Sequence, residues 1–528
     1  MDMKRFGTVC RKTLPLVAIP FLFTYQSQAR KRPNIIHIMS DDHSFQAISA
    51  YGHPLSEQAP TPNIDRLADE GMRFDRAYVE NSLSTPSRAC LMTGLYSHQN
   101  GQRRLGKGID TSRTFVSELL QRDGYVTGVV GKWHMKCEPK GFDDYHILKG
   151  QGEYYNPRFK TPQTRGAYVE EEGYATELIT QHAVDFIQKR DTTKPFCLFV
   201  HHKAPHRSWI PEMKYLELFA ETDFPVPETF YDDYSTRGRA AHEQRMHIGE
   251  DMLMVYDLKV HEHSSMLDEK DKWQCEVNDQ SLSELDETGR QAWLDAFSRQ
   301  NKAYLEGEVP ADSLAEWKYQ RYVRDYLSCI RSVDDSVGDI LKVLEEEGIL
   351  DETVIVYTSD QGFYMGEHGW FDKRFMYEES FRTPLVIRYP QLIAPGSVSE
   401  TLVQNLDFAP TYLDLAGVKV PEYMEGRSMK PVMKKGGAEP KKWRKYLYYH
   451  FYDNGGEHNV SKHDGVSDKR YKLIHFYGKG GTYDELYDLE KDPDELVNVI
   501  ENPEYADVRS RLSKALTRFR KRLQVDEF

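Results

Sequence analysis

The sequence predicts an α/β protein in which a mixed, mostly parallel sheet is sandwiched by helices. Residues 34–39 and 353–358 are continuous apolar runs, which are typical of strands buried on both faces of a parallel sheet. Residues 314–347 carry apolar side chains at three-and-four spacing before Gly348, which predicts a long amphipathic helix. Strand-like runs between residues 446 and 489, then a helical pattern over 505–523, predict a smaller C-terminal α+β subdomain with an antiparallel sheet and a helix.

The first 29 residues are typical of a secretory signal peptide. A basic region that includes Lys4 and Arg5 precedes an apolar stretch over 14–23, and Ser27 to Ala29 form a small-residue cleavage site. We therefore expect an exported protein, periplasmic or secreted, after cleavage near Ala29. The apolar stretch is too short to span a bilayer and no other segment approaches that length, so no membrane span is predicted.

At 528 residues the chain is long enough for a large domain with a smaller appendage. We predict a main domain over residues 30–430 and the C-terminal subdomain over 431–528. Residues 207–312 are charged and weakly periodic, which indicates an insertion that shapes the rim of a pocket. The net charge of −14 argues against nucleic-acid binding, and it requires that an anionic substrate be attracted by a local basic cluster.

Acidic and amide side chains follow both of the buried strand runs. Asp41 and Asp42 come directly after the first run, and Asp360 and Gln361 come after the second. Ligands of open α/β sheets bind at the carboxyl ends of strands, and clusters of oxygen ligands suit Ca²⁺ or Mg²⁺. Adjacent Asp residues also occur in ordinary turns. The second pair makes a metal site the favoured interpretation.

Residues 84–88, Ser-Thr-Pro-Ser-Arg, stand where an extended run over 72–78 gives way to a predicted helix. Unpaired N–H groups and the positive end of the helix dipole meet at a helix N-terminus, so Ser84 is well placed to contact an anion. Arg88, one turn further on, reaches back to the same point as a permanent cation. The ordinary alternative is that the serine is only an N-cap.

Residues 84–88 with Leu91, Thr93 and Gly94 resemble the signature of the type I sulfatases, members of the alkaline phosphatase superfamily. The resemblance covers nearly all of residues 33–500. It implies an alkaline-phosphatase-like fold, with residues 30–430 as the sulfatase catalytic domain. It also implies that Ser84 is oxidised to formylglycine (3-oxoalanine) by a radical maturation enzyme of the serine type, and that the aldehyde hydrate attacks sulfur.

The same resemblance places the remaining site residues. One Ca²⁺ would be bound by Asp41, Asp42, Asp360 and Gln361, with the matured residue 84 as a further ligand; many members have Asn or His in place of Gln361. The catalytic set would comprise residues that follow four different predicted elements: Ser84, Arg88, Lys132, His134, His206 and Lys373. In this scheme the cations hold the sulfate, His206 protonates the leaving oxygen, and His134 takes a proton from residue 84.

Substrate-binding residues are predicted beside Lys373 and in the C-terminal subdomain. Asp372 and Arg374 offer the donors and acceptors that sugar hydroxyls need, although an exposed ion pair is the alternative. His463, like His458, is expected on a loop over the pocket, and a surface histidine is the alternative. Segments 150–157, 372–374 and 465–474 look similar to the N-acetylglucosamine-6-sulfatase branch.

The predicted substrate is therefore a 6-O-sulfated N-acetylglucosamine of a heparan, keratan or mucin-type glycan. A sulfatase acting on galactosamine or galactose 6-sulfate or on uronic acid 2-sulfate stays open. So do a phosphatase or phosphonate hydrolase of the same superfamily, and a non-catalytic glycan-binding protein. The sequence leaves the oligomeric state undetermined.

Overall fold

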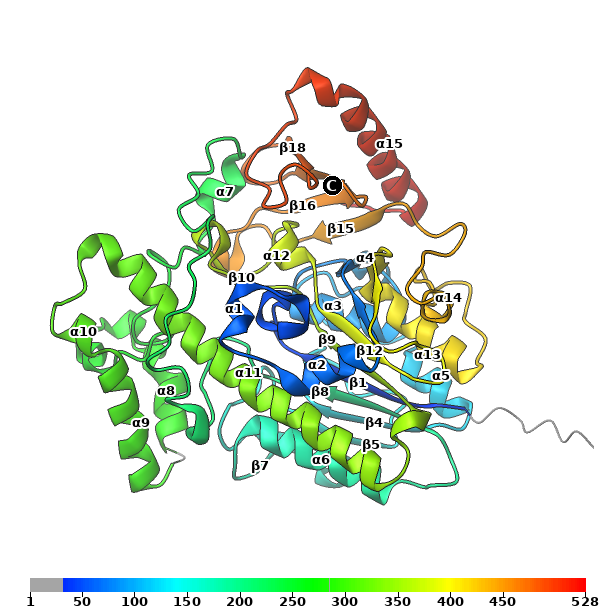
Figure 1. Cartoon of the computed structure of the whole chain (residues 1–528), viewed down its shortest axis with the longest axis horizontal. Coiled ribbons are helices and arrows are strands. Elements are labelled where there is room, and N and C mark those ends of the chain that lie inside the picture. Colours follow the sequence, from blue (N-terminus) through cyan, green and yellow to red (C-terminus); the bar gives the residue numbers. More distant parts are fainter. Residues whose placement is uncertain (1–31, 284) are drawn as a thin grey trace, which may run out of the picture. The chain divides into compact units, whose positions relative to one another are not determined.

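A computed structural model describes residues 32–283 and 285–528 (Figure 1). Its centre is a ten-stranded sheet with the order β13-β2-β12-β9-β1-β8-β4-β5-β6-β7. Strands β9, β1, β8, β4 and β5 are parallel to one another, whereas β12, β6 and β7 pair antiparallel with their neighbours. The strands are β1 Asn34–Ser40, β2 Met72–Phe74, β4 Val126–Gly131, β5 Asp144–Leu148, β6 Arg158–Lys160, β7 Val169–Glu170, β8 Phe196–His201, β9 Thr353–Ser359, β12 Leu385–Arg388 and β13 Ser397–Ser399.

Helices cover both faces of this sheet because its central strands are apolar on both sides. On β1, Ile36 and Ile38 face the cluster that contains α6 (Ala175–Lys189) and α11 (Leu314–Glu346). Ile35 and Met39 face the opposite cluster, which contains α3 (Ser84–Thr93), α5 (Val116–Arg122) and α13 (Phe408–Ala416). Every residue of β1 and β9 is buried, so the prediction of doubly covered strands is confirmed.

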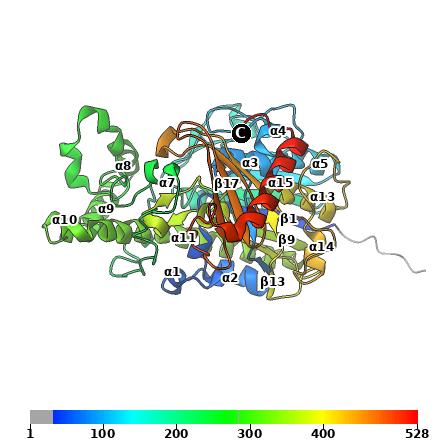
Figure 2. The same ribbon diagram turned by 90° about the horizontal axis from the view of Figure 1, so that it is seen from above.

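The C-terminal part forms a four-stranded antiparallel sheet of β15 Leu447–Phe451, β16 His463–Ser467, β17 Tyr471–Phe476 and β18 Tyr483–Asp488. Helix α15 (Ala506–Leu523) packs on β16 and β17, and Figure 2 shows it lying across this sheet. The sequence predicts strands at the places of β15, β17 and β18 but a loop in place of β16. The segment His-Asp-Gly-Val-Ser has few strand-forming residues, so pairing with both neighbours makes it a strand.

The predicted insertion at 207–312 consists mainly of irregular segments and short helices. Its α-helices are α7 Arg239–Glu243, α8 Trp273–Ser283, α9 Glu287–Gln300 and α10 Lys302–Leu305. Trp293 and Phe297 of α9 are fully buried in the cluster that contains α11, so the insertion is part of the folded core. The other short helices are α1 Pro54–Glu57, α2 Pro62–Asp69, α4 Ser97–Asn100, α12 Glu378–Phe381 and α14 Lys430–Lys434.

Two small two-stranded sheets complete the structure: β3 (Ala77–Tyr78) with β14 (Val403–Gln404), and β10 (Tyr364–Met365) with β11 (Phe371–Asp372). Residues Pro33–Phe528 form one compact unit, and the predicted domain boundary near residue 430 stays a prediction. Within the described residues, no helix is both long enough and apolar enough to cross a membrane. The predicted signal peptide lies outside the described residues.

Candidate active site

The carboxyl ends of β1 and β9 bring the predicted metal ligands together. The two strands pair in parallel with Ser40 opposite Ser359, so the residues that follow them meet at one edge of the sheet. The backbone N–H of Asp42 donates to Oδ1 of Asp360 over 3.1 Å, and Nε2 of Gln361 donates to Oδ1 of Asp42. These side chains are buried. The register of the parallel sheet therefore builds the cluster that the sequence predicts.

Ser84 lies against this cluster as the first residue of α3. Its Oγ donates to Oδ1 of Asp41 over 3.1 Å, and Nε2 of Gln361 lies 3.4 Å from the same Oγ. The N-cap position is taken by Leu83, and no side chain caps the helix. Ser84 therefore does not act as the ordinary N-cap that the sequence left open.

Three buried cations surround the carboxylates. On α3, Arg88 donates from Nη2 to Oδ2 of Asp360 over 3.0 Å, and from Nη1 to the Lys132 carbonyl over 2.8 Å. Lys132 follows β4 and forms an ion pair with Asp41. Nζ of Lys373 donates to Oδ2 of Asp42 over 2.6 Å. Each of the three carboxylates is therefore paired with one buried cation.

Electrostatics at the cluster favour a bound cation. Burial by itself would raise the pKa of Asp41, but Lys132 and its neighbouring cations hold that pKa well below its usual range. Burial, followed by the charge of Asp41, raises the pKa of Asp360 to about 7. Oε1 of Gln361 is buried and accepts no hydrogen bond from the described residues. Crowded carboxylates, an amide oxygen without a donor and an adjacent hydroxyl form a donor set that fits a divalent cation with oxygen ligands.

Two of the predicted histidines flank the cluster. Nε2 of His206 lies 3.8 Å from Oδ2 of Asp42, and its Nδ1–H donates to the Arg207 carbonyl over 2.7 Å. Nδ1 of His134 lies 3.4 Å from Oγ1 of Thr85. Burial, and then the charge of Lys132, lower the pKa of both imidazoles, so both are neutral at neutral pH in the free protein.

A cavity of about 320 Å³ opens next to Ser84, Lys373 and His206. Its wall also includes polar and charged residues from the insertion and the C-terminal part that the sequence did not single out: Arg207, Tyr256, Gln280, Ser281 and Glu457. Arg207 is held by Asp257 through two hydrogen bonds of 2.7 and 2.8 Å. The insertion carries no recognisable motif, so only the spatial arrangement reveals these residues.

Asp372 and Arg374 lie in the wall of the cavity and are buried, so the alternative of an exposed ion pair is wrong. They pair with each other, Oδ2 of Asp372 lies 3.2 Å from Nε2 of His458, and Arg374 donates to Glu457 over 3.2 Å. Both residues have positive φ, 76° and 96°. Strained backbone on both sides of Lys373 is typical of a functional site.

His463 is not on a loop over the pocket, as the sequence predicts, but on β16. Its ring is fully buried and stacks against Phe375 and Tyr449, with centroids 5.7 and 5.5 Å away. Nδ1–H donates to the Ser461 carbonyl over 2.9 Å. The prediction is wrong because β16 directs this side chain toward a buried cluster of aromatic side chains. His458 is also buried and does not line the cavity, although it contacts Asp372, which does.

The comparisons with known proteins agree with this arrangement. The Sulfatase family profile matches residues 33–418, and that of the N-sulphoglucosamine sulphohydrolase C-terminal region matches residues 366–522. The fold is therefore the alkaline-phosphatase-like α/β fold of the sulfatases, as predicted. Within that class, this chain belongs to the sulfatase family.

Several relatives cover most of the chain. An N-acetylglucosamine-6-O-sulfatase of Bacteroides thetaiotaomicron is 45% identical over 519 residues, which span 97% of this chain and 91% of the relative. A solved structure of a protein in complex with its substrate D-glucosamine-2-N,6-O-disulfate matches with a TM-score of 0.88 and 44% identity, over 94% of this chain and 99% of that chain. The N-acetylglucosamine-6-sulfatase of Homo sapiens is 25% identical over 450 residues, 80% of this chain and 68% of the relative.

Proposed function

We propose that this sulfatase hydrolyses the 6-O-sulfate ester of an N-acetylglucosamine residue in a sulfated glycan of the heparan, keratan or mucin type. The proposal rests on the observation that Ser84 and Lys373 line the same cavity as Asp372 and Arg374. Groups that suit an anion and groups that suit sugar hydroxyls therefore share one space. The similarity to an N-acetylglucosamine-6-O-sulfatase at 45% identity supports the choice of sugar.

The cofactors of this proposal are one Ca²⁺ and a formylglycine made from Ser84. Asp41, Asp42, Asp360 and Gln361 would hold the ion together with residue 84. When present, the formylglycine hydrate supplies the nucleophile and the ion supplies positive charge to the sulfate oxygens.

Side chains of the protein bind the sulfate, transfer the protons and orient the sugar. Arg88, Lys132 and Lys373 bind the sulfate and residue 84 as charges fixed before the substrate arrives. His206 protonates the departing sugar oxygen: it is neutral in the free protein, and an anion bound beside it favours its protonated form. His134 accepts a proton from residue 84 so that the site returns to its starting state. Asp372 and Arg374 orient the sugar.

Two partners follow from the proposal. The chain requires a radical maturation enzyme of the serine type, and the sulfated glycan is its substrate. Export to the periplasm or outside the cell is also proposed, on the basis of the leader at residues 1–29, which lies outside the described residues.

The test is sulfate release from N-acetylglucosamine 6-sulfate by protein coexpressed with a serine-type maturation enzyme, with Ca²⁺ present. We expect release by the wild-type protein and none by Ser84→Ala, while Ser112→Ala, at an exposed loop position, acts as the matched control. Mass spectrometry must show that residue 84 has lost its two hydrogens. Matured protein that releases sulfate from galactosamine 6-sulfate or uronic acid 2-sulfate instead would overturn the sugar assignment. Near-wild-type turnover by Ser84→Ala would overturn the mechanism.

A further inference from the structure

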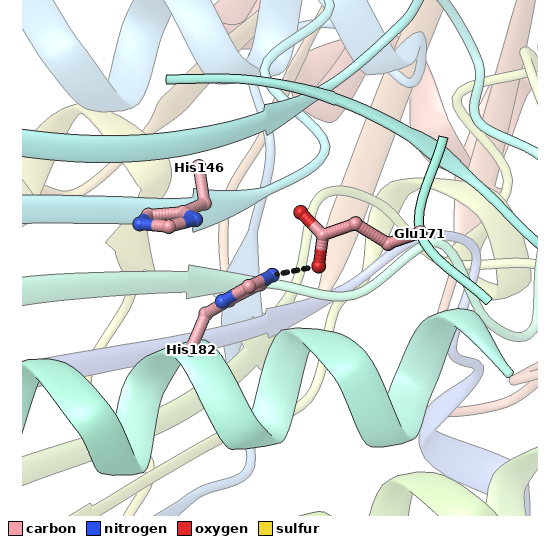
Figure 3. A group of neighbouring side chains, drawn as sticks. All are labelled: His146, Glu171 and His182. Atoms are coloured by element: carbon pink, nitrogen blue, oxygen red, sulfur yellow. Dashed lines mark hydrogen bonds and ion pairs between the residues drawn. The ribbon is translucent and has the colours of Figure 1, made fainter. Parts of the chain in front are cut away.

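A second group of metal-binding side chains lies at the edge of the main sheet, outside the cavity described above. It consists of His146 on β5, His182 on α6 and Glu171 just after β7. One ligand atom from each lies within 4.8 Å of the other two. Figure 3 shows the two imidazole rings one above the other, with the Glu171 carboxylate beside them. Three elements that are distant in sequence thus bring three ligands to one point.

One buried nitrogen of this group has no hydrogen bond within the described residues. Nε2 of His182 bonds to Oε2 of Glu171 over 2.9 Å, and the His146 and His182 rings stack with centroids 4.1 Å apart. Nδ1 of His146 is buried and has no hydrogen-bond partner within residues 32–283 and 285–528. A buried nitrogen without a partner costs free energy unless something binds it. A metal ion would satisfy it.

We propose that His146, His182 and Glu171 form a second metal site that binds a divalent transition metal of the zinc class. Two imidazole nitrogens and one carboxylate are a common ligand set for Zn²⁺, whereas Ca²⁺ and Mg²⁺ prefer oxygen ligands. Ligand atoms bound to Zn²⁺ at about 2.0–2.1 Å lie closer together than 4.8 Å. To complete the site, the two imidazole rings would turn from their stacked arrangement toward a common centre.

One carboxylate lies beside this group without belonging to it. Asp144, two residues before His146 on β5, places Oδ2 3.7 Å from Nε2 of that ring. Asp185 lies in the same hollow of about 250 Å³ but pairs with Lys189, which also lines it. Asp144 would therefore provide negative charge close to a metal ion held by His146.

The site has a structural consequence that is separate from sulfate chemistry. The metal would link β5, the segment after β7, and α6, which belong to the sheet edge and the helix that covers it. The oxygen-rich cluster at Asp41 and Asp42 would select a different ion. We expect that zinc binding stabilises the fold without being required for sulfatase activity.

The experiment is zinc binding to the full chain after removal of metals, in the presence of excess Ca²⁺ to fill the oxygen-rich cluster. Elemental analysis after gel filtration should find one Zn²⁺ per wild-type chain and none in His146→Ala or His182→Ala. His475→Ala is the matched control, because His475 contacts Asp484 but belongs to neither potential metal group. Zn²⁺ should raise the melting temperature of the wild type and the control only.

Glu171→Gln provides a second variant, which keeps both histidines and should lose most of the bound zinc. The melting temperature measured without zinc shows that each variant is folded. A wild-type chain that binds no zinc in excess Ca²⁺ overturns the proposal. Folded histidine variants that retain as much zinc as the wild type overturn it equally. Neither result bears on the sulfatase assignment, because these residues do not line the active-site cavity.

Discussion

Lys259 of the insertion is predicted to hold the segment that carries His206. Its fully buried Nζ lies within hydrogen-bond distance of four acceptors: the carbonyls of Ser208, Trp209 and Asp257 at 2.6, 2.8 and 2.9 Å, and Oδ2 of Asp325 at 3.1 Å. Asp257 in turn binds Arg207. The residues directly after His206, at the start of the insertion, are thus attached to a later part of it by one buried ammonium group and one carboxylate.

The substitution Lys259→Met removes this ammonium group while keeping most of the side-chain volume. Removing one partner of a buried ion pair costs about 3–5 kcal/mol. The entropy of unfolding is about 2.1 cal/mol/K per residue, or roughly 1.1 kcal/mol/K for 528 residues. We therefore expect the melting temperature to fall by about 3–5 °C. Because small misplacements of reacting groups cost up to about 100-fold in rate, kcat should fall by about 10-fold or more.

Thermal unfolding and steady-state sulfate release measure the two effects, with Lys318→Met as the matched control. Nζ of Lys318 also binds backbone carbonyls of the insertion, those of Gly249 and Met252 over 2.8 and 3.1 Å, but it makes no such bond near His206. We expect the control to lose stability without a comparable loss of kcat. Equal kcat losses in both variants, or a Lys259→Met protein with wild-type stability and turnover, would refute the reasoning.

Two further predictions concern metal removal and pH. Chelation should abolish sulfate release, because the sulfate oxygens then lose the positive charge of the ion; added Ca²⁺ should restore release, and full activity after verified removal would contradict this. Burial raises the pKa of Glu80 to about 8. Between pH 4.5 and 8 the folded state therefore binds more protons than the unfolded chain, so this residue makes stability fall as the pH rises. Glu80→Gln should flatten that fall, and parallel stability profiles of wild type and variant would speak against it.

The sequence by itself determined the elements whose signals are local. The largely apolar runs of β1 and β9 identify doubly covered strands because side chains on both faces of such strands are buried. The periodicity of 314–347 locates α11 to within one residue of its observed end. Parallel strands place their carboxyl ends at one edge, so the pairing of Asp41 and Asp42 with Asp360 and Gln361 was predictable before any contact was known.

Only the tertiary structure decided the features whose sequence pattern is weak or that depend on contacts between distant segments. β16 is a strand because two neighbours pair with it, and this pairing places His463 in an aromatic core. The insertion reaches the cavity through Arg207 and Tyr256, and no local pattern encodes that contact. No local pattern encodes the proximity of His146, Glu171 and His182 either, because they belong to three segments that only the fold brings together. A contact between distant segments depends on the packing of the whole chain, whereas a strand or helix with a strong periodic pattern is determined by its own residues.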